Sequence, residues 1–517
     1  GSGKTEVYLQ AISEVIILGM KAIVLVPEIS LTPQTIERFK SRFDRVAVLH
    51  SSLTERQRSD HWWDIKNGNA DVVVGARSAI FAPLENVGII VIDEEHENTF
   101  KQDTSPRYNA RDVSVVRAAY ENAVVVLGSA TPSLESFYNT DIGKYECVTL
   151  KNRVGQKPLP RVEIIDMRRE IYKGTGQKPI SGYLERSMKQ CLAQKEQVLL
   201  LLNRRGFSPF ISCRRCGFVL RCKRCDISLT YHKKREAVIC HYCFSDGPVP
   251  RECPDCCSPG IRFTGFGTER MEELIRGRFP QYNLLRMDSD TMRGRDSHEK
   301  ALSAVRRGDI DILLGTQMIA KGLDFPNVTL VGVLSADTIV NLPDFRASEK
   351  TFQLLCQVAG RTGRGAKGGK VIVQTYNPEH YSISSAASHD YDGFAKKELE
   401  YRKQLYYPPY GRLARVVLRG KKDLEVKEKA SDIAEKLMNA IKLSNGPLLA
   451  GLRKGKVGIL GPAPAPIVKV KDNYRWHLIV KADSFKNLHT ILKSIENENR
   501  NSKKVQMMID VDPYMLL

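Results

Sequence analysis

The chain has 517 residues, enough for several domains, and its 27% charged and 42% hydrophobic residues are ordinary for a globular protein in water. No apolar run approaches the ~20 residues that a membrane-spanning helix needs, which argues against an integral membrane protein. We expect a cytoplasmic protein that has no membrane partner; the natural start, where a signal peptide would lie, is absent from the sequence.

The formal net charge of +20 predicts a polyanionic partner, most simply nucleic acid, although many basic proteins only carry solvated lysines. The charge is uneven, because residues 401–517 contain 23 Lys and Arg against 11 Asp and Glu, a formal +12. A basic surface on one module suits contact with a phosphate backbone, so we expect a C-terminal DNA-binding domain.

The first five residues match the second half of a phosphate-binding P-loop, G-x-x-x-x-G-K-[ST]. Backbone N–H groups of this motif surround the nucleotide phosphates, the lysine binds the β- and γ-phosphates, and the Ser or Thr binds Mg²⁺. The motif's first glycine is missing here, and a chance Gly/Ser linker is the alternative for so short a match. The residues expected to bind ATP and Mg²⁺ are Gly1, Ser2, Gly3, Lys4 and Thr5.

The residues after the glycines favour the P-loop over a linker. Glu6 to Leu18 has the apolar spacing of a helix, and Ala22 to Val26 is an apolar run typical of a buried parallel strand. A helix that starts directly at the glycines is the setting in which a P-loop binds phosphate.

An acidic motif follows another predicted strand. Val87 to Ile92 is almost continuously apolar, and Asp93, Glu94, Glu95 and His96 come directly after it, at the end where open α/β sheets bind ligands. Asp93 is expected to hold Mg²⁺ through water, and Glu94 to orient or deprotonate the attacking water. An acidic loop that merely caps a strand is the alternative, which a P-loop upstream makes less attractive.

The cysteines show metal-ligand spacing. Eight of the twelve form four C-x-x-C pairs within 44 residues, and the short loop of each pair allows both sulfurs to reach one tetrahedral ion. Two Cys₄ zinc sites are therefore favoured over disulfides. The predicted ligands are Cys213, Cys216, Cys222, Cys225, Cys240, Cys243, Cys253 and Cys256.

Four pairs can combine into two sites in three ways. The two inner pairs enclose a loop of 14 residues between Cys225 and Cys240, close to zinc-ribbon spacing, which leaves the two outer pairs for the other site. We predict this nested arrangement. His232 and His241 could in principle replace a cysteine, but eight sulfurs already fill eight positions. The remaining thiols are expected to be free: Cys147, Cys191, Cys257 and Cys356.

The order of the motifs resembles that of superfamily 2 helicases over nearly the whole chain. After the P-loop and the acidic motif come the turns Gly128 to Pro132 and Gly315 to Gly322, each after a predicted strand, and then Gln357 to Arg364, which reads QVAGRTGR. The resemblance implies an α/β fold of two RecA-like lobes with parallel sheets and ATP between them. It also implies that Arg364, with Arg361 beside it, stabilises charge on the transferred phosphoryl group. Binding of nucleic-acid phosphates is the alternative role for both arginines.

Five longer segments and the position of the cysteine module are more specific. They are Val26 to Gln34, Gly75 to Phe81, Asp93 to His96, Leu202 to Phe207 directly before the cysteines, and Gly315 to Gly322. Together they resemble the PriA family of bacterial primosomal replication-restart DNA helicases, because generic superfamily 2 members carry no two-zinc module inserted in lobe 2. The nested zinc pairing is also the family's arrangement.

This resemblance implies an ATP-dependent 3′-to-5′ DNA helicase of the primosome, acting at stalled or branched replication forks to restart DNA replication. Its implied cofactors are ATP, Mg²⁺ and two Zn²⁺, and its implied partners are forked and single-stranded DNA, primosome proteins and single-strand-binding proteins. The family's N-terminal DNA-binding region has no counterpart in the sequence, which leaves branch recognition by this chain open. Lys321 to Asp324 also departs from the family's Lys-Gly-His pattern.

Residues 98–111 occupy the position of the family's aromatic-rich loop, which links DNA contact to ATP turnover. Stacking on bases by Phe100 and Tyr108, with Lys101, Arg107 and Arg111 on phosphates, is the functional interpretation. An ordinary polar surface loop is the alternative.

The anchors predict lobe 1 at 1–177, lobe 2 at 178–400 with the two-zinc module inserted at 211–258, and a small α+β domain at 401–517. In the last domain, a stiff turn at 461–466 precedes Lys469, Lys471, Tyr474, Arg475 and Trp476, a set that suits single-stranded nucleic acid. Core packing of Trp476 beneath a solvated lysine face is the alternative.

Two functions of different classes remain. The first is a DNA-translocating ATPase in which Lys4, Asp93, Glu94, Arg361 and Arg364 carry catalysis. The second is a zinc-dependent scaffold that binds nucleic acid and protein and whose ATPase is inactive in this chain. RNA as the polymer stays open, because residue types do not distinguish it from DNA.

Overall fold

The structure of the chain is a computed structural model. It describes residues 3–516 except 29–32, 52, 151, 153–158, 171–178, 203–209, 233–234, 260, 264–267, 289–290, 293–296, 321–324, 326, 361–367, 444–456 and 500–503. The chain divides into two compact units, Gly1–Leu159 with Met318–Asp324, and Pro160–Gln317 with Phe325–Leu517.

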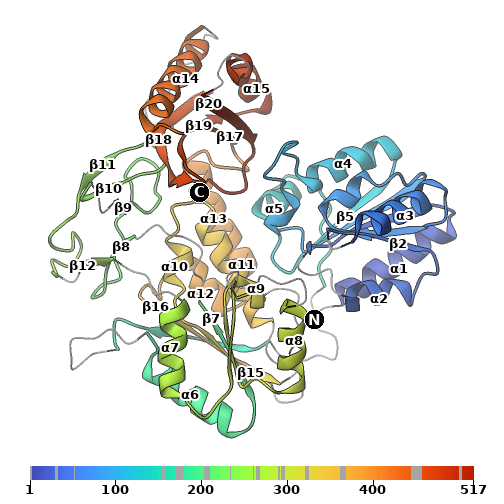
Figure 1. Ribbon diagram of the computed structural model, residues 1–517, viewed down its shortest axis with the longest axis horizontal. Helices are drawn as coiled ribbons and strands as arrows, with labels where there is room; N and C mark the ends of the chain where they lie inside the picture. Colours follow the sequence, from blue (N-terminus) through green and yellow to red (C-terminus); the bar gives the residue numbers. More distant parts are fainter. Residues whose placement is uncertain are drawn as a thin grey trace. The chain divides into compact units, whose positions relative to one another are not determined.

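The first unit is built on a parallel five-stranded sheet with strand order β2-β3-β1-β4-β5. Figure 1 draws this unit in blue to cyan, with β2, β5 and helices α1 to α5 labelled. Its strands are β1 (Lys21–Leu25), β2 (Val46–Leu49), β3 (Val72–Gly75), β4 (Val87–Asp93) and β5 (Val124–Gly128). Its helices are α1 (Lys4–Ile17), α2 (Pro33–Lys40), α3 (Glu55–Lys66), α4 (Ala110–Glu121) and α5 (Leu134–Asp141), with short 3₁₀ turns η2 (Arg77–Phe81) and η3 (Asn98–Phe100).

Both faces of this sheet are buried, which explains the continuous apolar runs. Ile90 and Ile92 of β4 pack in one core with residues of α4 and η2, whereas Ile89 and Val91 pack in a second core with residues of α1 and α2. Successive side chains of a strand point to opposite faces, so a strand covered on both sides needs apolar residues at every position.

The second unit contains a parallel six-stranded sheet of order β13-β14-β7-β15-β16-β6. Its strands are β6 (Arg161–Asp166), β7 (Gln197–Leu201), β13 (Leu284–Met287), β14 (Ile312–Gly315), β15 (Val328–Val333) and β16 (Lys370–Thr375). The helices along this part of the chain are α6 (Gly182–Ala193), α7 (Thr268–Arg278), α8 (Ser297–Arg307), α9 (Gln317–Ala320), α10 (Asp337–Val340), α11 (Ala347–Ala359), α12 (Tyr381–Ala387) and α13 (Tyr391–Gln404).

Because of strand β6, the boundary between the units lies earlier in the chain than the sequence predicts. We expected lobe 1 to reach residue 177, but β6 pairs in parallel with β16 from Arg161↔Lys370 to Asp166↔Thr375. The N-terminal stretch of the first unit therefore ends at Leu159. The chain crosses to the second sheet before the Pro/Gly-rich connector around 173–176, because β6 completes the edge of that sheet.

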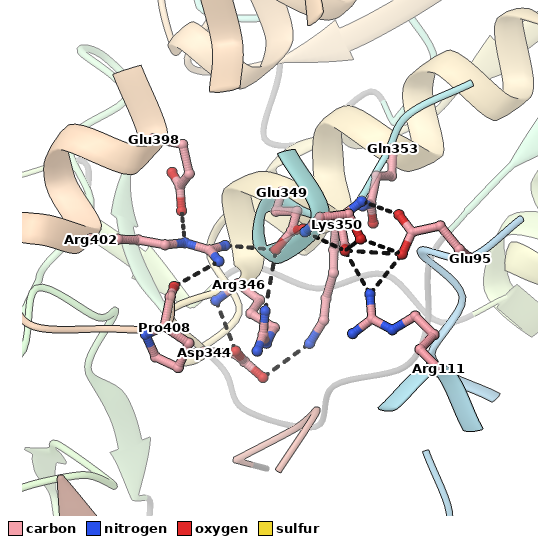
Figure 2. Close-up of polar contacts among 12 residues, drawn as sticks. Glu95, Arg111, Asp344, Arg346, Glu349, Lys350, Gln353, Glu398, Arg402 and Pro408 are labelled. Atoms are coloured by element: carbon pink, nitrogen blue, oxygen red, sulfur yellow. Dashed lines mark hydrogen bonds and ion pairs between the residues drawn. The ribbon is translucent and has the colours of Figure 1, made fainter. Parts of the chain in front are cut away.

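A buried ionic network joins α11 to α13 (Figure 2). Arg402, 1% exposed, donates to Glu349 at 2.7 Å and to Glu398 at 3.0 Å, and also to the Pro408 carbonyl at 3.2 Å. Removing one member of such a buried set leaves an uncompensated charge, which typically costs about 3–5 kcal/mol. The network thus fixes α11, the helix that leads into residues 361–364.

The cysteine module and the C-terminal domain complete the second unit. The module contains the three-stranded sheet β11-β10-β9 and the pair β12-β8; the C-terminal sheet has the order β18-β19-β17-β20. Module strands are β8 (Ile211–Cys213), β9 (Thr230–His232), β10 (Ala237–Ile239), β11 (Asp246–Pro248) and β12 (Ile261–Phe263). The C-terminal elements are β17 (Arg412–Gly420), α14 (Asp423–Leu443), β18 (Val457–Val470), β19 (Asn473–Ala482), α15 (Phe485–Lys493), η5 (Glu496–Asn499) and β20 (Val505–Val511).

The C-terminal sheet is antiparallel, and α14 packs on it through a regular apolar stripe that includes Val426, Ala430, Ile433 and Leu437. The predicted fold class is therefore confirmed: two parallel α/β sheets, a cysteine-rich module within the second unit and a small α+β domain. Among the described helices, none combines the length and apolarity needed to cross a bilayer.

Candidate functional site

The acidic motif lies at the carboxyl edge of the first sheet, beside the start of α1. Asp93 ends β4, and Lys4 begins α1. The Lys4 Nζ donates to Glu94 Oε1 at 3.2 Å and lies 4.0 Å from Asp93 Oδ1. The structure thus brings together the lysine of the five-residue motif and the two carboxylates to which the sequence assigns catalysis.

The described part of the helix start has features that suit phosphate binding. Gly3 precedes α1 with φ of 87°, in the left-handed region that favours glycine, and its carbonyl accepts from the Glu6 N–H at 2.9 Å. Lys4 and Thr5 form the first turn, where helix N–H groups and the helix dipole attract anions. Gly1 and Ser2 lie outside the described residues.

The electrostatics of the site suit a divalent cation. Burial raises the pKa of Asp93 and the adjacent Glu94 carboxylate raises it further, whereas Lys4 lowers it. One lysine against two carboxylates leaves an excess of negative charge, and carboxylate oxygens are the ligands that Mg²⁺ prefers. The donor set around Asp93 therefore fits a magnesium ion bound with a nucleotide.

Two residues to which the sequence assigned no role, Tyr8 and His96, complete the site. The Tyr8 hydroxyl donates to Asp93 Oδ1 at 3.2 Å, and burial followed by the Asp93 charge raises the pKa of Tyr8 well above its usual value, so it stays a donor. His96 Nδ1 lies 2.7 Å from Ser129 Oγ and 3.6 Å from Glu94 Oε2. The spacing of Lys4 and Tyr8, one helical turn apart, was the available signal for Tyr8.

The arginines of the QVAGRTGR segment cannot be placed. Arg361 and Arg364 lie outside the described residues, directly after the C-terminal end of α11. Their catalytic role stays a prediction.

The loop at 98–111 differs from its functional interpretation. Phe100 is 1% exposed and packs in the core, and Lys101 is also buried, so neither side chain is available to a nucleic acid. Arg111 is engaged with Glu95 at 2.7 Å. Tyr108 is half-buried and contacts Phe81 edge-on at 4.9 Å. The expectation of base stacking by Phe100 and phosphate contact by Lys101 and Arg111 is wrong for the structure described, because Phe100 packs in the core with residues of α4 and η2, Lys101 is buried, and Arg111 is paired with Glu95.

The eight paired cysteines form two clusters, and the nested arrangement is the one observed. In the outer cluster the sulfurs of Cys213 and Cys256 are 3.6 Å apart; in the inner cluster those of Cys222 and Cys243 are also 3.6 Å apart. Within each cluster all four sulfurs lie within 4.8 Å of one another. A tetrahedron with Zn–S of ~2.3 Å has sulfurs ~3.8 Å apart, so both clusters fit Zn²⁺.

The histidines of the cysteine module contact each other and the C-terminal domain. His232 and His241 contact each other at 3.3 Å between their Nε2 atoms, and His241 Nδ1 lies 2.9 Å from the Pro464 carbonyl on β18. Neither belongs to a cysteine cluster of the described residues. Together with Tyr407, whose hydroxyl donates to the Cys225 carbonyl at 3.3 Å, they attach the inner cluster to the C-terminal domain.

The C-terminal segment proposed for nucleic acid has two parts. Trp476 is 3% exposed and donates from Nε1 to Asp423 at 2.9 Å, so the core-packing alternative is correct for it. Residues 461–466 belong to strand β18 and do not form the expected turn. Lys469 and Lys471 are exposed near the hairpin between β18 and β19, where Lys469 lies over the Tyr474 ring at 5.4 Å.

Comparison with known families matches four segments of the chain. The DEAD/DEAH box helicase model matches residues 1–140, the PriA DNA helicase Cys-rich region domain 222–246, the helicase conserved C-terminal domain 261–366, and the Primosomal protein N C-terminal domain 403–514.

Similar curated proteins bear the name replication restart protein PriA. The protein of Bacillus subtilis is 49% identical over all of this chain and 63% of its own length, and that of Synechocystis sp. is 43% identical over all of this chain and 62% of its own length. The Haemophilus influenzae protein is 40% identical over all of this chain and 69% of its own length. The chain thus spans a little under two thirds of the first two relatives.

Proposed function

The chain belongs to the replication restart protein PriA family, and we propose that it is the motor part of an ATP-dependent DNA helicase that restarts replication at stalled or branched forks. Family models for both helicase regions match the chain. The alternative hypothesis, a binding scaffold without catalysis, is therefore not favoured. Translocation in the 3′-to-5′ direction is the finer part of this proposal and rests on the family.

The observation that carries the proposal is the convergence of Lys4, Asp93 and Glu94 at one edge of the first sheet. With ATP and Mg²⁺ bound, Lys4 would exchange its carboxylate partners for the β- and γ-phosphates, while Thr5 and Asp93 would hold the metal. Glu94 would accept a proton from the attacking water. The nucleotide supplies the phosphoryl group whose transfer to water drives translocation.

The remaining assignments are proposals of the same kind. Arg361 and Arg364 would stabilise charge on the transferred phosphoryl group. The two cysteine clusters would hold two Zn²⁺, and as structural sites they would stabilise the module by closing its chain segments around the ions. The exposed lysines of the C-terminal domain would contact DNA phosphates. Primosome proteins and single-strand-binding proteins are the proposed protein partners, and the cytoplasm is the proposed location.

The test is ATP hydrolysis by the 517-residue chain with single-stranded DNA, with RNA of matched length, and without polymer. We expect turnover that DNA stimulates more than RNA. Absence of turnover under all three conditions, with ATP binding intact, would count against a motor. Unwinding of partial duplexes that carry either a 3′ or a 5′ single-stranded tail then tests the direction of translocation. Faster unwinding of the 5′-tailed duplex would contradict the proposed 3′-to-5′ polarity.

A further inference from the structure

Glu95, the third residue of the acidic motif, is buried although no catalytic role is assigned to it. It is 1% exposed, and its carboxylate accepts from Arg111 Nη1 at 2.7 Å, the Ser133 N–H at 2.5 Å and Ser136 Oγ at 3.0 Å. Figure 2 shows the guanidinium of Arg111 facing this carboxylate. Ser133 Oγ donates as well, at 3.1 Å, which makes four donors to one buried carboxylate. They fix its position, because a polar group that loses its partner in a buried place has no water to replace it.

These contacts join three segments that are distant in sequence. Glu95 follows β4, and its own N–H donates to the Gly128 carbonyl at the end of β5 at 3.1 Å. Ser133 caps α5, directly after the turn that contains Ser129. Arg111 lies in the first turn of α4, directly after the loop that begins at residue 98. Glu95 therefore connects the acidic motif with both the turn after β5 and the end of that loop.

The neighbouring residue needs such support. Glu94 has φ of 48°, in the left-handed region, which costs a non-glycine residue roughly 1–3 kcal/mol. A strained conformation persists only where the surrounding structure determines it. Asp93, in the β4 ladder, holds one side of Glu94, and Glu95 holds the other through its backbone and side chain.

We propose that Glu95, held by Arg111, is a positioning residue that keeps the Glu94 carboxylate directed at the nucleotide site. The proposal deepens the proposed ATPase and rests on it.

The central variant is the double substitution E95Q/R111M. Each single substitution leaves a buried charge without its partner and is expected to destabilise the first unit, whereas the double substitution removes both charges and keeps an amide oxygen for the Ser133 N–H. We expect the double variant to recover thermal stability relative to E95Q and R111M. We also expect kcat for DNA-stimulated ATP hydrolysis to stay about 10- to 100-fold below that of the unaltered chain, with KM for ATP within twofold.

Two further variants separate positioning from stability. R111K keeps a cation at the same place and should regain most of the kcat that R111M loses. R117M removes another arginine of α4, which donates to the carbonyls of Ile80, Ala82 and Leu84 and to Glu121, away from Glu95. It should lower stability while kcat per folded molecule stays unchanged.

Hydrogen exchange of the amides at 129–136 provides a readout that needs no turnover. Exchange there should accelerate in E95Q/R111M but not in R117M. If the double variant shows parental kcat, or parental exchange at these amides, Glu95 has no positioning role. If the unaltered chain hydrolyses no ATP, the proposed function fails, and the exchange comparison alone decides whether Glu95 and Arg111 hold this segment.

Discussion

The Tyr8 hydroxyl on α1 donates a hydrogen bond of 3.2 Å to Asp93 at the end of β4. The packing there leaves no spare room: a Cβ atom on Gly128 would lie 1.6 Å from the Tyr8 oxygen. Helix α1, which begins within the predicted P-loop, is therefore positioned directly against the proposed magnesium ligand, and a glycine at the end of β5 makes this approach possible.

Replacing Tyr8 with Phe should weaken the response to Mg²⁺. The hydrogen bond from Tyr8 lowers the pKa of Asp93, so its loss favours the protonated carboxyl and disfavours metal binding. A hydrogen bond to a charged group contributes about 1.5 kcal/mol or more, so the Mg²⁺ concentration for half-maximal ATPase should rise about tenfold. Titration of ATPase against Mg²⁺ at saturating total nucleotide measures this change. An unchanged midpoint would mean that Tyr8 only packs.

Lys4→Ala and Glu94→Gln should both abolish ATP hydrolysis and unwinding, with at least a 100-fold loss, while DNA binding persists. Lys4→Ala should also weaken ATP binding, because it removes the cation for the phosphates. Glu94→Gln should bind ATP normally, since it loses only the proton acceptor. Turnover, nucleotide binding and DNA binding are measured in parallel. Normal unwinding by either variant would contradict the assigned catalytic roles.

Metal content tests the nested zinc sites. We expect about two zinc ions per chain by elemental analysis. Cys225→Ser should lower the content toward one and should loosen the contact between the module and the C-terminal domain, because Tyr407 donates to the Cys225 carbonyl. Cys257→Ser is the matched control: this thiol is exposed and lies outside both clusters, so its removal should leave two ions. Equal zinc content in the two variants would refute the inner site.

Asp337 should make the stability of the second unit depend on pH. It is buried at the start of α10, where it accepts from Thr375 Oγ1 at 3.0 Å and from the Tyr376 N–H. Burial raises the pKa of Asp337 from 3.8 to about 6. Between these two pKa values the folded state binds more protons than the unfolded state. The contribution of Asp337 to the free energy of unfolding is therefore complete below pH 3.8 and is lost as the pH rises through about 6. The loss amounts to roughly 3 kcal/mol.

Asp337→Asn removes this titration. The difference in unfolding free energy between the variant and the unaltered chain should therefore shift in favour of the variant between pH 4 and pH 7, whatever constant offset the amide introduces. Urea unfolding at several pH values, followed by a probe in the second unit, measures the shift. A difference that stays constant with pH would show that Asp337 titrates normally.

Features that depend on neighbouring residues could be predicted from the sequence. The buried strands were recognisable because a strand covered on both faces is apolar at every position, and β4 runs from Val87 to Asp93 as expected from that run. Two cysteines with two residues between them can reach one ion whatever the rest of the fold does, so the two sites were also predictable. The functions of the acidic motif and of the glycines before α1 were also predictable, because each motif consists of residues that are adjacent in the sequence.

The role of a single side chain was decided by the tertiary structure. The sequence suggests that Phe100 and Trp476 stack on bases of a nucleic acid, but both side chains are buried. Phe100 packs in the core that contains residues of α4, and Trp476 packs in the core of the C-terminal sheet. Likewise β6 joined the second sheet through pairing with β16, far along the chain. The sequence alone determined the motifs, their order and the metal-ligand spacing. The tertiary structure decided which side chains stay accessible and that Tyr8 and Glu95 support the acidic motif. These features depend on contacts between segments that are distant in the chain, and a local sequence pattern does not contain them.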